Sequence, residues 1–271
     1  LVGVGLVGAI KSLFLWSVIF SGLAMFGLGK EIFGALGGLI AAIFYLYAPF
    51  RLVDLYVRGS LGESLAFVFF PLLFLALIKI ARGNNLWVSW GALLFAGLIL
   101  THNVAALLFT PFLIVFCLFF RRRRFRFGLL LTLGFGLSAF FLLPALIEKN
   151  LIALSQEPLA DITKHFVGLK QLILPGWGYG SPSTEDAFSF QLGWVHLLGL
   201  LVALIFWRKD RPKAGGFAEL VFKFCLVSLS ILVFLMTPLS LPFWQKMPLF
   251  SEIDFPWRLL GPAAFFLALG L

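Results

Sequence analysis

The sequence predicts an all-α, polytopic integral membrane protein with about eight to nine transmembrane helices, and three observations predict it. Of 271 residues, 61% are hydrophobic and 12% are charged, against about 25% charged in soluble domains. Apolar windows long enough to cross a bilayer follow one another along the chain. Lys and Arg concentrate in alternate connections, as in multi-pass proteins. A soluble fold of this size cannot cover so much apolar surface.

The predicted spans are separated by short polar connections. Residues 86–120 are too long for one span, and Thr101-His102-Asn103 predicts the apex of a helical hairpin there. Residues 148–190 form a long outer loop. Because Leu1 and Leu271 both lie in apolar runs, we expect a single transmembrane domain over 1–271 that is an internal fragment of a longer protein. The predicted spans are 12–29, 31–50, 64–81, 86–101, 103–120, 126–147, 191–207, 217–238 and 256–271.

Charge predicts the orientation in the cell membrane. If the first span ends inside, the connections near residue 30 and at 79–85, 121–126 and 208–216, with Glu219 and Lys223, hold thirteen bases and three acids. The opposite side holds the other eight bases and nine acids. Lys and Arg enrichment marks the cytoplasmic side. The arginine run at 121–126 is therefore interpreted as facing lipid headgroups, and no nucleic-acid partner is expected.

The most unusual polar residues fall on the predicted outer side, first in the segment 47–63. Pro49 is expected to end the preceding span. Arg51, Asp54 and Arg58 then share one face of a short helix, which would lie along the interface with its charges directed away from lipid. We expect Gly59 to end this helix. Ser60 and Glu63 have the spacing of a capping box; as a functional alternative, the two arginines grip a phosphate or pyrophosphate.

Three further outer clusters supply candidate residues. His102 either sits at the hairpin as a structural residue or hydrogen-bonds a phosphate or hydroxyl. Glu148 opens the long outer loop, whose Trp177 and Tyr179 suit either a lid or an interfacial aromatic belt. Before the last span, Trp257 is expected to be an interface anchor, and the remaining candidates are Glu252, Asp254 and Arg258.

Known catalytic and cofactor motifs are absent from the sequence. No P-loop, Rossmann glycine fingerprint, HExxH or nucleophile elbow occurs. The three histidines lack metal-ligand spacing, so no structural zinc is expected. Glu252 and Asp254 could hold a divalent cation together with a phosphate, which leaves the cofactor unknown.

The order of the motifs resembles a known family. The blocks Tyr47 to Glu63, Thr-His-Asn (101–103), Leu-Pro-Ala-Leu-x-Glu (143–148) and Phe-Pro-Trp-Arg (255–258) are similar to those of prokaryotic membrane proteins with a "6-pyruvoyl-tetrahydropterin synthase-related" domain. Pterin synthase itself is a small soluble zinc enzyme with a three-histidine site. This chain has neither property, so no pterin is expected.

The family's arrangement is similar to that of GT-C-type membrane glycosyltransferases. The resemblance implies a GT-C-like enzyme that uses a polyprenyl-phosphate-linked sugar on the extracytoplasmic face, with Arg51, Arg58, His102 and Arg258 around the lipid phosphate. The catalytic acid of such enzymes would precede Leu1, so no catalytic residue is assigned and the fragment alone is expected to be inactive. Arg58→Ala is expected to abolish activity of the full-length protein without loss of folding. The alternatives are a transporter or flippase of a lipid-linked or anionic solute, and a non-catalytic assembly protein of envelope glycans.

Overall fold

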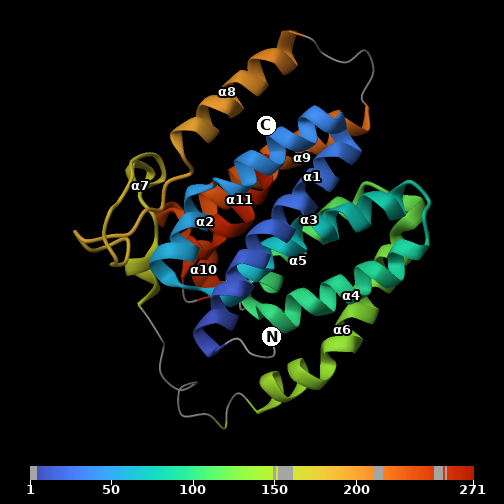
Figure 1. The fold of residues 1–271 in the computed structure, drawn as a ribbon, viewed down its shortest axis with the longest axis horizontal. Coiled ribbons are helices and arrows are strands. Elements are labelled where there is room, and N and C mark those ends of the chain that lie inside the picture. Colours follow the sequence, from blue (N-terminus) through green and yellow to red (C-terminus); the bar gives the residue numbers. More distant parts are fainter. Residues whose placement is uncertain (1–4, 149–150, 152–160, 210–215, 247–252, 254) are drawn as a thin grey trace.

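The computed structural model describes residues 5–148, 151, 161–209, 216–246, 253 and 255–271, and these form helices joined by loops (Figure 1). By length and composition, four of the described helices can cross a membrane. They are α1 (Leu6–Leu46), α3 (Leu61–Ala81), α6 (Arg124–Ile147) and α9 (Phe217–Met236). Shorter apolar helices are α4 (Leu86–Thr101), α5 (Asn103–Leu118), α8 (Trp194–Lys209) and α11 (Leu260–Leu269), the last preceded by a helical turn at Pro256–Leu259. The predicted all-α membrane architecture is confirmed, and the number of spans stays a prediction.

Helix α1 is two helices that meet at a sharp break. Gly34 has φ 83° and ψ 179° inside α1, a conformation that is open to glycine and strained for other residues. A Cβ atom added to Gly29 would lie 2.8 Å from Cα of Gly38. The two halves therefore cross with glycines in backbone contact, as small residues allow in membrane helices. The predicted windows 12–29 and 31–50 correspond to these halves, with the break four residues later than expected.

The end of α1 differs from the prediction. The helix stops at Leu46 instead of residue 50, and Pro49 begins the next helix, α2 (Pro49–Val53). Proline suits the first turn of a helix because the backbone N–H that it lacks has no partner there. Helix α2 continues into a π-helical turn, Asp54–Arg58, which ends at Gly59 as predicted. Gly59 has a left-handed φ of 58°.

Aromatic side chains form the centre of the bundle around α3. The Phe74 ring lies 4.4 Å from Phe116 and 5.6 Å from Phe265, measured between ring centroids. These contacts join α3 to α5 and α11, while α6 packs mainly on α4 at the periphery (Figure 1). Helix α8 lies at the opposite edge (Figure 1), where His196 Nε2 donates to the carbonyl of Phe44 at 2.7 Å.

The predicted cytoplasmic connections near residue 30 and at 79–85 and 121–126 meet at one end of the bundle, beside the start of α9. Glu31 accepts from Lys79 at 2.6 Å and also pairs with Arg82. The Arg82 guanidinium lies 5.1 Å from the Phe217 ring centroid, and the Arg123 side chain lies beside Gly83. The structure thus places these connections on one side, here named the basic end. That this end faces the cytoplasm stays a prediction.

The described part of the long outer loop has structure of its own. It contains a short helical turn, Ile162–His165, and α7 (Leu169–Ile173), and it reaches α8 through Gly193, which has φ 100°. Phe166, Phe188 and Phe190 anchor it in the core. A further short helix, α10 (Leu241–Lys246), follows α9.

Candidate functional site

Five of the predicted site residues gather at the end of the bundle opposite the basic end, and we name them the polar cluster: Asp54, Arg58, Glu63, His102 and Arg258. The Arg58 guanidinium donates to Glu63 Oε2 at 2.7 Å and also pairs with Asp54. Glu63, His102 and Arg258 line a cavity of about 10 Å³, about the size of one water molecule. Residues from three separate sequence motifs therefore form one site. We name its cavity the polar cavity.

The charged face of the 51–58 segment, predicted to be directed away from lipid, points into the protein. Arg51 and Asp54 are 1% and 0% exposed, whereas Tyr56 is 82% exposed. Charges near membrane depth are tolerated where protein groups pair with them, and α1 and α3 supply those groups. The predicted capping box is wrong: Ser60 is the N-cap of α3 without a side-chain cap bond, and Glu63 pairs with Arg58 instead.

Arg51 ties α2 to the first half of α1. Its Nη2 donates to Ser21 Oγ at 2.6 Å and to the Ser17 carbonyl at 3.1 Å. Its guanidinium lies 5.0 Å from the Phe67 ring centroid. Among the described residues, those that line the polar cavity include neither Arg51 nor Arg58. Arg58 belongs to the polar cluster because it pairs with Glu63, whereas Arg51 has no such contact with the described residues of the cluster.

An aromatic bed holds Arg58 in place. Its guanidinium lies 4.6 Å from the Trp257 ring centroid and 5.7 Å from that of Phe50. Phe188 of the outer loop meets the other side of the contact, edge-on to Trp257 at 5.3 Å. Cation–π contacts strengthen when the cation is desolvated. The sequence interpretation placed Trp257 at the membrane interface and missed this role, although its position next to Arg258 was visible.

Two carboxylates share one arginine in this buried setting. Burial raises the pKa of Asp54, the charge of Glu63 raises it further, and Arg58 opposes both effects. The side chain of Glu63 is also buried, with 6% exposed. The shared Arg58 therefore holds two buried carboxyl groups together beside the polar cavity.

His102 combines a structural and a site role. Its Nδ1 accepts from the backbone N–H of Ala105 at 2.9 Å and caps α5. The ring proton of the neutral form therefore sits on Nε2. Burial lowers the pKa of His102, the charge of Glu63 opposes this, and Arg258 and Arg58 add to it. The predicted hairpin apex is confirmed. In the neutral His102 ring, the cap uses Nδ1, and the Nε2–H remains as a hydrogen-bond donor.

The contribution of His102 to stability is expected to fall as the pH drops from about 7.5 to 5.5, through the ordinary histidine pKa of about 6.5. Because the folded pKa of His102 is lowered, the unfolded state binds this proton first and the folded state loses stability. Asp54, whose pKa is raised, contributes with the opposite sign. Thermal unfolding in detergent of the parent and of His102→Asn, which keeps a capping side chain, isolates the histidine term. An unchanged pH dependence in His102→Asn would contradict it.

The remaining candidates are not among the residues that the structure places in the polar cluster. Glu148 is exposed at the end of α6, and Glu252 and Asp254 lie outside the described residues. Trp177 and Tyr179 are 90% and 76% exposed, so both the lid and the aromatic belt stay open as interpretations. Within the described ranges, no three His, Cys, Asp or Glu side chains are grouped to hold a metal ion.

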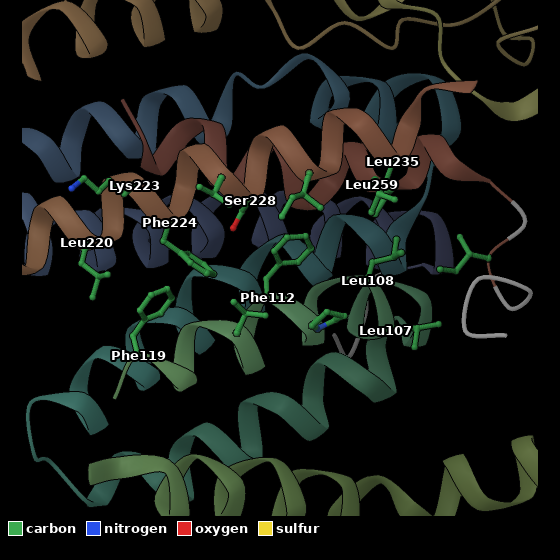
Figure 2. Close-up of a pocket in the computed structure, with 15 residues that line it drawn as sticks. Leu107, Leu108, Phe112, Phe119, Leu220, Lys223, Phe224, Ser228, Leu235 and Leu259 are labelled. Carbon is green, nitrogen blue, oxygen red and sulfur yellow. The ribbon is translucent and has the colours of Figure 1, made fainter. Parts of the chain in front are cut away.

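An apolar groove lies between α5 and α9 (Figure 2). This α5–α9 groove has a volume of about 510 Å³. Figure 2 shows Phe119, Leu220 and Lys223 at one end and Leu107, Leu108, Leu235 and Leu259 at the other. Leu108 also lines the polar cavity. The groove therefore runs from the basic end of the bundle to the site. It was not predicted, because it depends on how α5 and α9 diverge.

The comparisons with known proteins agree with the motif resemblance. The family model described as "6-pyruvoyl-tetrahydropterin synthase related domain; membrane protein" matches residues 6–269. No curated protein and no solved structure matched. The match covers nearly the whole chain, including every residue of the polar cluster. This chain therefore belongs to the family of membrane proteins with a 6-pyruvoyl-tetrahydropterin synthase related domain.

Proposed function

We propose that the protein is a membrane-embedded, glycosyltransferase-like enzyme that uses a polyprenyl-phosphate-linked sugar at the face of the membrane opposite the basic end. One observation carries this proposal. A membrane-facing apolar groove ends at a cavity lined by Glu63, His102 and Arg258. The apolar groove would hold the lipid tail, and the polar cavity at its end would hold the charged headgroup.

The length of the groove favours an isoprenoid over an ordinary acyl chain. Its lining on α9 runs from Leu220 to Leu235, about 22 Å at 1.5 Å per residue. One leaflet of the hydrocarbon core is about 15 Å thick, half of the whole core. A tail that follows the groove therefore extends past the bilayer midplane, which a polyprenyl chain can do.

The polar cluster has the charges that a lipid phosphate needs. Arg58 belongs to the polar cluster and Arg258 lines the polar cavity, so the site holds guanidinium groups of the kind that bind phosphate oxygens. Arginine donors aimed at a leaving phosphate stabilise the charge that develops when a sugar–phosphate bond breaks. The Nε2–H of His102 supplies a hydrogen-bond donor in the same place, and Asp54 and Glu63 supply carboxyl groups.

Filling the α5–α9 groove tests the proposal. In the full-length protein, Val227→Trp places an indole in the groove lining, while Ser230→Trp on the same helix points away from it and serves as the control. Membrane vesicles containing the protein are supplied with a polyprenyl-phosphate sugar, and sugar transfer is measured. Transfer is expected to be lost in Val227→Trp and kept in Ser230→Trp.

Two other outcomes would overturn or redirect the assignment. Equal transfer in both variants would show that the groove does not hold the donor. Movement of the lipid-linked sugar across the vesicle membrane without transfer would favour the flippase alternative.

A further inference from the structure

A second apolar groove reaches the same polar cavity from the other side of α5. This α5–α6 groove has a volume of about 680 Å³ and runs along α6 from Thr132 to Leu146, with Asn103 and Val104 at its end on α5. Val104 also lines the polar cavity. Leu107 is shared by the two grooves, and Leu108 by the α5–α9 groove and the cavity. One turn of α5 thus separates two grooves that converge on one polar site.

We propose that the α5–α6 groove holds the tail of a second lipid, so that the acceptor of the transferred group is itself a membrane lipid. This inference rests on the proposed function and extends it to the acceptor. An enzyme that joins two soluble molecules needs no apolar groove. An enzyme that acts on a single lipid needs a single apolar groove. Two grooves at one polar cavity match a reaction between two lipid-anchored substrates.

The charges at the two grooves differ, and this difference indicates which lipid each groove would hold. The α5–α9 groove ends at Ile253 and Leu259, on either side in sequence of Arg258, which favours a phosphate there. The α5–α6 groove has no charged residue in its lining over the described residues, and Asn103 is the polar side chain at its end. An amide suits a hydroxyl-bearing, uncharged headgroup. The second lipid is therefore expected to be neutral, with a hydroxyl as the accepting group.

Two glycines of α6 make a matched pair of variants. A Cβ atom on Gly136, which lines the α5–α6 groove, or on Gly128, which does not, would meet nothing within 4 Å. Gly136→Phe therefore adds a ring to the groove lining with no clash at its Cβ atom, and Gly128→Phe adds the same ring to the same helix elsewhere. Any general effect of the substitution on α6 appears in both variants.

The experiment uses the full-length protein in vesicles with two photoreactive probes, a diazirine-tailed polyprenyl phosphate and a diazirine-tailed diacylglycerol. Labelled peptides are mapped by mass spectrometry. The diacylglycerol is expected to label α6 around Gly136, and Gly136→Phe should reduce this labelling to the level of the peripheral helix α8. Gly128→Phe should leave it unchanged. The polyprenyl phosphate should label α9 in all three proteins.

The contrary results are distinguishable. Labelling of α6 that is no stronger than that of α8, or that Gly136→Phe leaves unchanged, would show bulk lipid only and overturn the second site. Absence of all lipid labelling along the groove would show that protein covers it, with the same consequence. Failure of the polyprenyl phosphate to label α9 would instead contradict the proposed function.

Discussion

Arg58→Ala is expected to lower the free energy of unfolding by about 3–5 kcal/mol, because it leaves the buried carboxylates of Asp54 and Glu63 without their shared partner. The loss also includes the cation–π contact with Trp257. The measurement is thermal or denaturant unfolding of the protein in detergent. This expectation replaces the one from sequence, in which the variant loses activity but folds normally.

A second background tests the cause of the loss. With Asp54→Asn and Glu63→Gln, the site holds no carboxylate to be left uncompensated. Arg58→Ala in that background should cost much less than in the parent, since the two effects are coupled through contact. An equal cost in both backgrounds would mean that Arg58 acts through packing and not through its charge.

Phe74→Ala is expected to destabilise the protein by about 3–5 kcal/mol, the usual range for removing a fully buried ring. Its side chain is 0% exposed and meets rings from α5, α9 and α11, including Phe224 at 5.9 Å and Phe266 at 6.3 Å. Alanine would leave a cavity where four helices meet. Helix α3 carries Glu63, and α11 begins just after Arg258. Lipid binding at the site should therefore weaken together with stability.

The matched control is Phe140→Ala on α6, where the ring is 73% exposed. Removal of a surface-facing side chain usually changes stability by less than about 0.5 kcal/mol. Unfolding of the two variants in the same detergent makes the comparison. A loss in Phe140→Ala as large as that in Phe74→Ala would contradict the packing described for this bundle.

The sequence by itself determined the positions of most helices. Apolar length predicted α4 at 86–101 and placed α3, α5, α6 and α9 within a few residues of their observed ends. Gly59 predicted a helix end because a left-handed residue is most easily a glycine. Thr101-His102-Asn103 predicted a hairpin apex. The basic connections were grouped correctly because lysine and arginine cannot remain in the hydrocarbon core.

Several features of the site were decided only by tertiary structure. In a soluble protein, a helix shows its buried face by its apolar stripe, but a membrane helix is apolar all round. The sequence therefore could not distinguish the buried Phe74 from the exposed Phe140, or show that α5, α6 and α9 diverge into two grooves. It also could not show that Arg51 turns inward, because its partner Ser21 becomes a neighbour only after the chain has folded back at Gly34.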